Sequence, residues 1–538
     1  MSLPERFVER TLRELGVEEG RALCEALESE SPTSVRLNAS KCRPAGASPA
    51  DNRQETATLP GVATLPGVAM PTDADGLPDA GGRSDADKRP EAAELPAAAA
   101  PAAAPAAPCL PTDSADADAV ARLLPDLPHL PLLRRVPWCA DGWYLRERPS
   151  FTFDPDFHAG AYYVQEASSQ FVGHLLRGRL PAGARVLDLC AAPGGKTTLY
   201  ASLVGREGLV VANEIDRRRA SVLADNVRKW GTGNVAVTCC DAASLGRFEA
   251  WFDAVTVDAP CSGEGMFRKD PAAREEWSEA NVRLCAARQD EILREAWRAL
   301  KPGGVLLYST CTFNREEDEG SLERMLAWAE TEVEETGPVE VDPAWGICCG
   351  RVGAFRTFRF YPHRTCGEGF FAAVARKSAE ADARTRTPKS RRSVLTPVDR
   401  KCAAELWRWL TEPEAMRFGM AGDTCYAWYA GQAEAVRTLS EVLPVIGSGV
   451  ALGQIFKGVL KPDPALAFFP GLNRTAVPVA ELAEEEALRY LRRQEIAAAG
   501  LAEGMNLICV RDRGLGFAKR IGSRVNNLYP NSLRIMKQ

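Results

Sequence analysis

Residues 185–198 read Arg-Val-Leu-Asp-Leu-Cys-Ala-Ala-Pro-Gly-Gly-Lys-Thr-Thr. The apolar run 185–189 predicts a buried strand, and the glycines at 194 and 195 predict a turn that opens into a helix. A glycine turn lets the backbone approach a ligand closely, and the free N–H groups at the start of a helix favour an anionic group. This stretch therefore predicts a strand–turn–helix unit that binds a nucleotide-like cofactor.

The chain around this turn alternates between helix-like and strand-like patterns. Helices are predicted over 165–176, 195–203, 216–229 and 278–299, and strands over 185–189, 209–213, 234–238, 253–257 and 304–308. Such alternation indicates an α/β fold, with a parallel sheet and helices on both of its faces. A last strand, 370–375, is expected to complete the sheet. Ligands of such sheets bind at the carboxyl ends of the strands.

Acidic residues stand at those strand ends. Glu214 follows the glycine turn by about 20 residues, where an acid binds the ribose hydroxyls in dinucleotide-binding folds. Asp241 occupies the matching place after the next strand, available to an adenine amino group, and Asp258 ends the strand after that. Each acid alone is typical of a solvated strand end. Three of them at consecutive strand ends favour a cofactor site.

Two cysteines lie just beyond strand ends, Cys261 in Asp258-Ala-Pro-Cys-Ser-Gly263 and Cys311 in Ser309-Thr-Cys-Thr312. A free cysteine is usually a small hydrophobic residue of a core. These two instead stand in turns rich in Pro, Ser, Gly and Thr, where backbone N–H dipoles or Lys196 would favour a thiolate. Two thiols beside a cofactor suit attack on an electron-poor carbon followed by release. The pattern therefore predicts a methyl-transfer site.

Two other kinds of site, a P-loop and a zinc site, share residue types with these motifs. Gly195-Lys-Thr197 matches the end of the P-loop motif of nucleoside triphosphatases, and 254–258 resembles the strand that carries their metal-binding acid. The first glycine of that motif would fall at Cys190, whose side chain should obstruct the phosphate cradle. Zinc is not expected either, because the chain lacks paired ligand spacing and has only 4 histidines. No metal is therefore predicted.

Composition divides the 538 residues into several expected regions. Residues 44–133 are rich in Ala, Pro and Asp and are predicted to form a disordered insertion. They separate two parts of an N-terminal subdomain, 1–43 and 134–152, which precede a catalytic domain at 153–377, a basic linker at 378–397 and a C-terminal region at 398–538.

Charge is distributed unevenly. The whole chain carries −6, but residues 44–130 hold 13 acidic against 5 basic residues, so the remainder carries +2. The densest basic cluster consists of Arg384, Arg386, Lys389, Arg391 and Arg392. This cluster could follow a phosphate backbone or could belong to a solvated linker.

The chain is expected to be a reduced, cytoplasmic protein. Its 16 cysteines show no Cys-x-x-Cys pair, and residues 1–7 carry charge where a secretion signal would be apolar. No stretch of about 18 apolar residues suggests a membrane span.

The motifs at 190–197, 258–263 and 309–312 together resemble those of the NOP/SUN family of RNA cytosine-C5 methyltransferases. The resemblance extends through Tyr361-Pro-His-Arg-Thr-Cys-Gly-Glu-Gly-Phe370, and 525–534 is similar to the ending of the bacterial RsmF branch, which carries a PUA-like RNA-binding module. It implies a Rossmann-like, class I S-adenosylmethionine-dependent methyltransferase fold with a small N-terminal subdomain and an α+β, PUA-like C-terminal region. The insertion departs from the family pattern.

The resemblance also implies roles for individual residues. Cys311 is the nucleophile that adds to carbon 6 of cytosine, Cys261 acts in product release, and Asp258 binds the ring edge, with Lys196 nearby. S-adenosylmethionine is the expected cofactor, held by Cys190, Ala191, Ala192, Pro193, Gly194, Gly195, Lys196, Glu214, Asp241 and Asp258.

The expected partner is RNA. In DNA cytosine methyltransferases the cysteine of the Pro-Cys motif attacks the base. Here the resemblance gives the attack to Cys311 of the Thr310-Cys311 motif and release to Cys261 of the Pro-Cys motif, and this favours an RNA substrate. The RsmF branch implies 16S rRNA or the small ribosomal subunit; transfer RNA and a non-catalytic RNA-binding role are the alternatives. The target base must leave its stack, so single-stranded or irregular RNA is favoured. A monomer without membrane or metal partners is expected.

Overall fold

The computed structural model describes residues 2–42, 127–382, 384–389 and 394–537. Most of the expected insertion at 44–133 lies outside these residues, as do Arg391 and Arg392 of the expected basic linker. Residues 127–133 are described, and Leu127 and Leu130 are buried in the core of the N-terminal subdomain. The second part of that subdomain therefore begins before residue 134, because these leucines supply apolar surface to its core.

The N-terminal subdomain consists of three helices and an antiparallel four-stranded sheet in the order β2-β3-β1-β4. Its elements are α1 (Glu5–Leu15), α2 (Val17–Leu27), β1 (Ser34–Leu37), β2 (Leu132–Val136), β3 (Cys139–Leu145), α4 (Pro155–His158) and β4 (Tyr162–Val164). Strand β1 lies between β3 and β4, so a strand that precedes the insertion is sandwiched by strands that follow it.

The central sheet has five parallel strands in the order β9-β8-β5-β6-β7, as the alternating pattern predicts. The strands are β5 (Arg185–Asp188), β6 (Leu209–Asn213), β7 (Val235–Thr238), β8 (Phe252–Asp258) and β9 (Leu300–Thr310). The helices between and around them are α5 (Phe171–Leu176), α6 (Gly195–Val204), α7 (Arg217–Trp230), α8 (Ala242–Gly246), α9 (Pro271–Glu276), α10 (Glu279–Ala299) and α11 (Glu319–Ala329). The helix expected over 165–176 is shorter than predicted, because only a 3-10 turn, Ser168–Gln170, precedes α5.

The sheet is mixed rather than parallel throughout. Strand β13 (Phe370–Lys377) is antiparallel to β9, and β10 (Val333–Glu334), β11 (Cys348–Val352) and β12 (Phe355–Phe360) continue the antiparallel edge. The short link 361–369 joins β12 to β13 without a crossover helix, and such a link suits an antiparallel pair. On the opposite edge, β17 (Val445–Ser448) comes from the C-terminal region and pairs antiparallel with β7.

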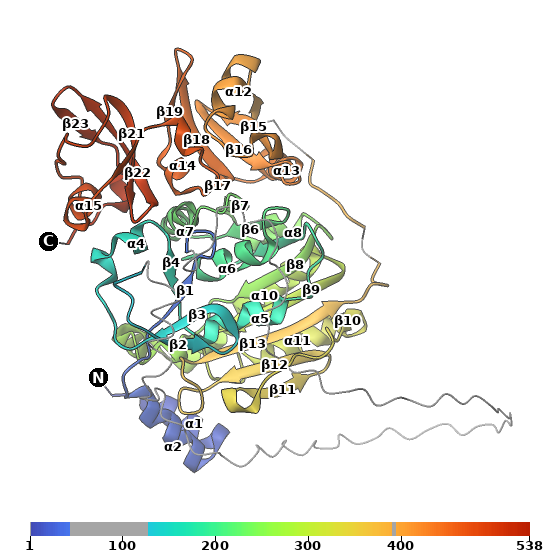
Figure 1. The fold of residues 1–538 in the computed structure, drawn as a ribbon. Coiled ribbons are helices and arrows are strands. Elements are labelled where there is room, and N and C mark those ends of the chain that lie inside the picture. The colour runs from blue at the N-terminus through green and yellow to red at the C-terminus, as the bar shows by residue number, and fades with distance from the viewer. Residues whose placement is uncertain (1, 43–126, 383, 390–393, 538) are drawn as a thin grey trace, which may run out of the picture. The chain divides into compact units, whose positions relative to one another are not determined.

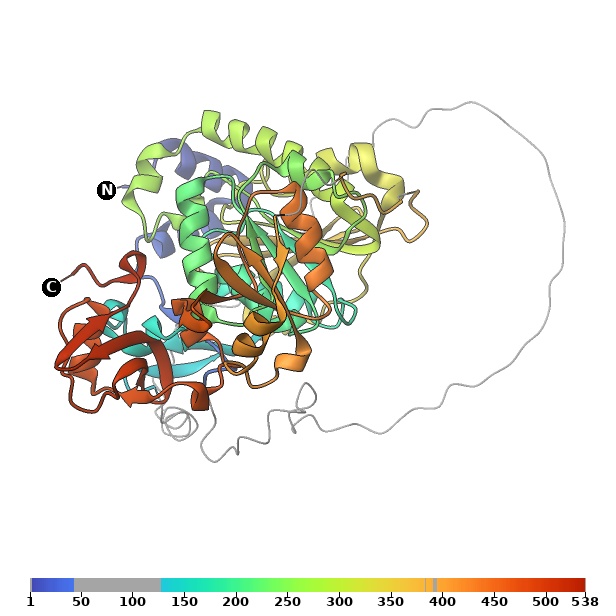
Figure 2. The ribbon, with the colours of Figure 1, turned by 90° about the horizontal axis from the view of Figure 1, so that it is seen from above.

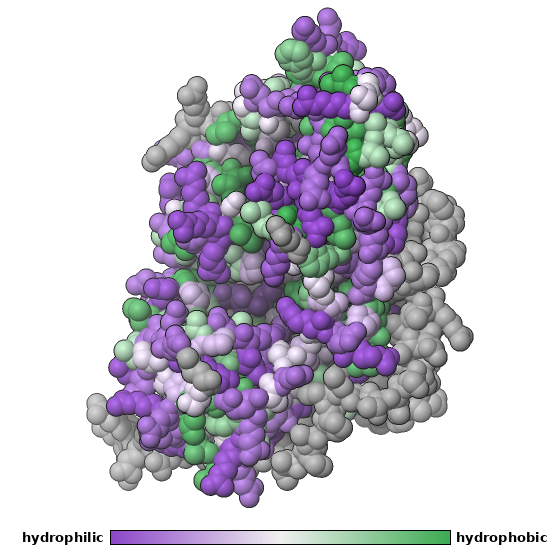
Figure 3. Space-filling view, turned by 90° about the vertical axis from the view of Figure 1, so that its left-hand side faces the viewer, coloured by the Kyte–Doolittle hydropathy of each residue, from purple (hydrophilic) through white to green (hydrophobic). Residues whose placement is uncertain are grey.

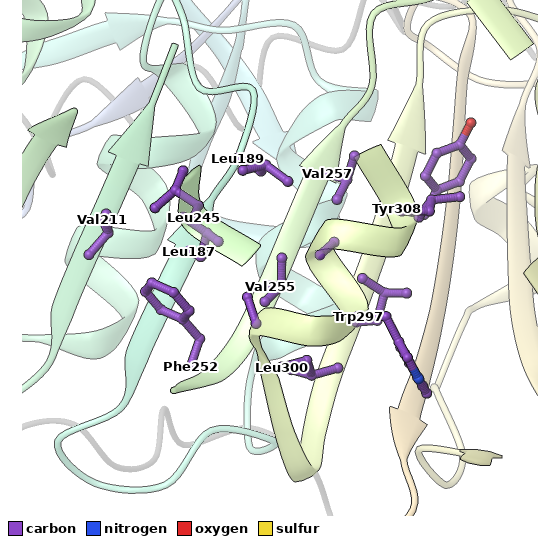
Figure 4. Packing of buried hydrophobic residues seen from close by; sticks show 14 of the residues in the cluster. Leu187, Leu189, Val211, Leu245, Phe252, Val255, Val257, Trp297, Leu300 and Tyr308 are labelled. Carbon is purple, nitrogen blue, oxygen red and sulfur yellow. The ribbon is translucent and has the colours of Figure 1, made fainter. Parts of the chain in front are cut away.

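Side chains of the central strands alternate between two buried clusters, one on each face of the sheet. Leu187 points into a cluster that α8, α10, α11 and α13 (Ala433–Val442) cover, whereas its neighbour Val186 points into one that α5, α6 and α7 cover. Figure 4 shows Phe252, Val255 and Trp297 packed in the first of these clusters. Burial of each such side chain contributes roughly 1.5–3 kcal/mol, which fixes the strand ends that carry the site.

The C-terminal region contains two further sheets (Figure 1). The first, in the order β14-β15-β16-β18-β19, comprises β14 (Thr396–Pro397), β15 (Met416–Ala421), β16 (Thr424–Tyr429), β18 (Val450–Phe456) and β19 (Val459–Pro462), with α12 (Arg400–Trp407) and α14 (Pro464–Phe468). The second comprises β20 (Val479–Glu481), β21 (Gly504–Val510), β22 (Arg513–Ile521) and β23 (Arg524–Asn527), with α15 (Glu484–Leu491).

The N-terminal and C-terminal regions both contact the catalytic part of the chain. Phe7 of α1 packs edge-on against Phe267 and Trp277, with ring centroids 5.0 and 5.9 Å apart, and Figure 2 shows α1 and α2 beside the helices of that segment. The C-terminal region contacts the central sheet through the pairing of β17 with β7. It also contacts the N-terminal subdomain, because Asp156, fully buried on α4, forms ion pairs with Arg511 at 2.7 Å and Arg513 at 2.9 Å. No helix of the described residues is long and apolar enough to cross a membrane. On the face shown in Figure 3, hydrophobic residues form small separate patches among hydrophilic ones.

Candidate active site

The glycine turn connects β5 to α6 as predicted. Gly194 has a φ of 112°, and a Cβ at this position would lie 3.0 Å from the Leu223 side chain, so only glycine fits. Ala191 and Ala192 are buried and Cys190 is half-buried, while Pro193 is exposed. Burial raises the pKa of the Cys190 thiol, so this sulfur stays neutral. The first N–H groups of α6 have no partner within the helix, which suits the carboxylate of a cofactor.

The buried carboxyl group of Asp188 is hydrogen-bonded to the first turn of α6. Asp188, at the end of β5, is 1% exposed and accepts a hydrogen bond of 2.6 Å from the Thr197 hydroxyl. Burial raises the pKa of Asp188 to about 7. Its second oxygen, Oδ1, is buried and has no hydrogen-bond partner among the described residues. A buried acceptor without a partner favours a donor supplied from outside the chain.

Arg36 of β1, in the N-terminal subdomain, forms hydrogen bonds to the start of α6. Its guanidinium donates to the Gly195 carbonyl at 3.1 Å and to the Thr198 hydroxyl at 2.6 Å. Nothing near Arg36 in the sequence indicated this contact, because it joins positions 159 residues apart.

Glu214 and Asp241 differ in their surroundings. Glu214 is 3% exposed at the end of β6, accepts a hydrogen bond of 3.1 Å from the Asp216 backbone, and lies 3.4 Å from the Arg219 guanidinium. Asp241 is exposed and caps α8 by accepting from the Ser244 backbone at 2.8 Å, which lowers its pKa. Asp241 is thus the N-cap of a helix, a role that the strand-end pattern did not predict.

Lys196 and Asp258 form an ion pair of 2.9 Å between α6 and the end of β8. Ser309, at the end of β9, donates a hydrogen bond of 2.8 Å to the other oxygen of Asp258. Burial lowers the pKa of Lys196, but the charge of Asp258 and the hydrogen bond to it raise the pKa by more, so the ammonium stays protonated.

The two cysteines lie side by side. The Sγ atoms of Cys261 and Cys311 are 3.3 Å apart, although 50 residues separate them in sequence. The hydrogen bond with Cys311, together with burial, raises the pKa of Cys261 well above its ordinary value, so this group is held as a thiol. The turns after β8 and β9 therefore bring both predicted thiols together beside the Lys196–Asp258 pair.

Buried carboxylates that the sequence analysis missed hold the two cysteine turns. Glu317 accepts from the Ser262 backbone N–H at 3.0 Å and from the Asn314 amide at 2.7 Å. Glu264 accepts from the Thr312 hydroxyl at 2.7 Å and from the Phe313 backbone N–H at 2.8 Å. Each acid lies within six residues of a cysteine, and that nearness was the available signal.

Glu264 also reaches the N-terminal subdomain. Arg10 of α1 donates to it at 3.1 Å, and the Trp277 indole N–H donates at 3.0 Å. No group of three or more His, Cys, Asp or Glu side chains within the described ranges could hold a metal ion.

The fold and this arrangement of groups define an S-adenosylmethionine-dependent methyltransferase of Rossmann-like fold. Three family models match the chain: 16S rRNA methyltransferase RsmB/F over residues 179–376, the PUA domain of methyltransferase RsmF over 477–535, and the N-terminal domain of 16S rRNA methyltransferase RsmF over 116–167. These matches coincide with the glycine turn, both cysteine turns and the last sheet.

Curated relatives agree with the family models. The chain is 32% identical to ribosomal RNA small subunit methyltransferase F of Erwinia tasmaniensis, over 76% of this chain and 86% of that protein. It is 33% identical to the protein of the same name from Klebsiella pneumoniae, over 74% of this chain and 84% of that protein. The chain belongs to the family of ribosomal RNA small subunit methyltransferase F, and the cofactor of this class, S-adenosylmethionine, is the one predicted from the sequence.

A solved structure has the same fold. The crystal structure of PH0851 is similar with a TM-score of 0.50 and 24% identity, covering 70% of this chain and 66% of that one.

Proposed function

We propose that this protein methylates carbon 5 of a cytosine in 16S rRNA through a transient covalent bond between Cys311 and the base. The observation that carries the proposal is the pair of sulfur atoms 3.3 Å apart, next to the ion pair of Lys196 and Asp258. Carbon 5 of cytosine is a weak nucleophile, so a prior addition at carbon 6 is needed to activate it.

Cys311 makes that addition as a thiolate. A bond forms from its sulfur to carbon 6, and the electrons of the carbon 5–carbon 6 double bond shift so that carbon 5 becomes nucleophilic. The Lys196 ammonium, which forms an ion pair with Asp258, is proposed to favour the negative charge that enters the ring. Asp258 is also proposed to hold the edge of the ring.

S-adenosylmethionine, when bound, supplies the methyl group that carbon 5 takes up. The glycine turn at 194–195 and the start of α6 are proposed to receive its carboxylate, and the buried acid Glu214 its ribose hydroxyls. Asp241 is the proposed partner of the adenine amino group, in addition to its role as the cap of α8. The φ of 112° at Gly194 and the buried Oδ1 of Asp188 both fit a ligand at this turn.

Release requires two bonds to break. A base takes the proton from carbon 5, the electrons of that bond restore the ring double bond, and the bond between carbon 6 and the Cys311 sulfur breaks. The departing sulfur takes the proton of the Cys261 thiol, and the proton that left carbon 5 then replaces it on Cys261. Cys261 is the proposed residue for this step, because its thiol touches the sulfur that must leave. The raised pKa of Cys261 means that it meets that sulfur as a proton donor.

The proposed substrate is RNA whose target base can leave its stack at low cost, as in a loop or junction. Membership of the family supports 16S rRNA, either free or in the small subunit, and the match of 477–535 to a PUA domain supports an RNA-binding C-terminal region. Transfer RNA remains the alternative that the experiment must distinguish.

The experiment compares single cysteine variants of the full chain. Cys311→Ala should abolish formation of 5-methylcytosine, whereas Cys261→Ala should accumulate a protein–RNA adduct that survives denaturant. Cys402→Ala, which removes a thiol from α12, is the matched control and should behave like the wild type. Free 16S rRNA, small-subunit particles and transfer RNA are offered in parallel. Full turnover by Cys311→Ala would end the proposal.

A further inference from the structure

The hairpin formed by β18 and β19 exposes large apolar side chains to solvent. Phe456 and Val459 face each other as the last paired residues of the hairpin, and they are 69% and 63% exposed. Their neighbours on the opposite face behave differently: Leu460 is buried and Ile455 packs against the same core cluster. The hairpin therefore has a core-facing side and an outward side, and the outward side carries a phenylalanine where a polar residue would be expected.

Positive charge surrounds Phe456. Alternation along the strands places Gln454 and Lys461, a pair in the register, on the same outward side, and both are exposed. Lys457 lies in the turn, with its ammonium 5.5 Å from the centroid of the Phe456 ring. No acidic residue occurs between Leu452 and Lys461. The surface is thus an exposed aromatic ring between two lysines, without a carboxylate in the hairpin to neutralise them.

The turn itself favours a different residue at one of these positions. Lys457 and Gly458 have φ values of 52° and 80°, the left-handed pair that a two-residue hairpin turn requires. Asparagine or glycine adopts such a φ more readily than lysine. A lysine at this position gives the turn an exposed cation despite the backbone preference for asparagine or glycine.

We infer that the outward face of this hairpin, with Phe456 at its centre, binds an unpaired segment of the RNA substrate. An aromatic face stacks on a base of any sequence, and lysines on either side contact the phosphates that follow it. The inference rests on the proposed function, since it takes RNA to be the substrate.

The test removes the ring and measures affinity. Phe456→Ala in the full chain should weaken binding of free 16S rRNA and of a short single-stranded oligouridine by about 5- to 150-fold. Phe456→Trp should restore affinity, because indole also stacks. Leu284→Ala, which removes an apolar side chain that is 58% exposed on α10, away from the hairpin, is the matched control and should bind like the wild type.

The lysines have a separate readout. If Lys457 and Lys461 each neutralise one phosphate, the double change to glutamine should reduce the slope of log affinity against log salt by about 1.4 on single-stranded RNA. The double change to arginine should keep the slope. At saturating RNA, the Phe456→Ala enzyme should methylate at the wild-type rate, because the hairpin acts only in binding.

Each outcome decides a different point. Equal RNA affinity for Phe456→Ala and wild type would overturn the inference. Normal affinity for free RNA combined with lost affinity for the small-subunit particle would also overturn it and assign the hairpin to a ribosomal protein instead. If wild type forms no 5-methylcytosine but Phe456→Ala still loses affinity for oligouridine, the proposed function fails while the hairpin remains an RNA-binding surface.

Discussion

Glu264→Gln is the sharpest test of how the cysteine turns are held. Glu264 is 1% exposed and accepts hydrogen bonds from Arg10, Trp277, Thr312 and the Phe313 backbone. Glutamine has the same shape but turns one of the two acceptor oxygens into a donor. Whichever oxygen is replaced, a buried N–H group faces another donor, and the Arg10 cation loses its shorter ion pair and keeps the one with Glu14 at 3.4 Å.

The expected loss follows from those contacts. An unsatisfied buried donor costs about 1–3 kcal/mol, and breaking a buried ion pair costs about 3–5 kcal/mol. The Arg10 side chain keeps 10% exposure, which lessens the second contribution. We therefore expect Glu264→Gln to lower the free energy of unfolding by about 2–4 kcal/mol.

Urea unfolding of the full chain measures this loss, and the formation of 5-methylcytosine measures its effect on the site. Glu276→Gln, an exposed glutamate on α9, is the matched control and should change stability by less than about 0.5 kcal/mol. In Glu264→Gln, methylation should fall by about 100-fold, since Thr312 adjoins Cys311, the proposed nucleophile, and a displacement of about 1 Å has that effect. Equal stability of the Glu264 and Glu276 variants would refute the reasoning.

Three further outcomes are expected. Gly194→Ala should weaken binding of S-adenosylhomocysteine by at least about 10-fold in calorimetry, because its φ of 112° excludes a side chain; Gly447→Ala, where a Cβ meets nothing within 4 Å, should not. Asp188→Asn should flatten the pH dependence of unfolding, because burial raises this pKa from 3.8 to about 7. Between about pH 4 and 7 the folded wild-type chain keeps a proton on Asp188 that the unfolded chain loses. The free energy of unfolding of the wild type therefore falls by about 4 kcal/mol as the pH rises through this range. Deletion of 44–126 should preserve methylation, whereas deletion of 44–130 should lower the melting temperature, because it also removes the buried Leu127 and Leu130.

The local pattern of the sequence predicted the parallel strands and the glycine turn because both are encoded within a few residues. Val186, Leu187 and Leu189 give this strand apolar side chains on both of its faces, as a strand buried on both faces needs, and the glycines at 194 and 195 follow five residues after Leu189. Cys261 and Cys311 were predicted to share a site because parallel strands end at the same edge, and the 3.3 Å between their sulfurs agrees with that argument.

Long-range pairings escaped prediction because local pattern does not encode them. Strand β17 reads as a short apolar run, and only its register with β7 makes it part of the central sheet. Arg10 and Arg36 are ordinary cations in the sequence, and their contacts with Glu264 and Gly195 join residues 254 and 159 positions apart. Asp241 was predicted to end a strand, but it lies three residues beyond β7 and caps α8 through its bond to Ser244, which the strand pattern does not predict.

Carboxylates, rather than the two cysteines, hold the cysteine turns in place. A turn just beyond a strand leaves backbone N–H groups that must find acceptors, and in this chain carboxylates provide them: Glu317 for Ser262 and Glu264 for Phe313. These bonds fix both turns through oxygen, so the geometry of the turns does not depend on the thiols. In the proposed mechanism, Cys311 therefore forms and breaks its bond to the base while the loop that carries it stays in place.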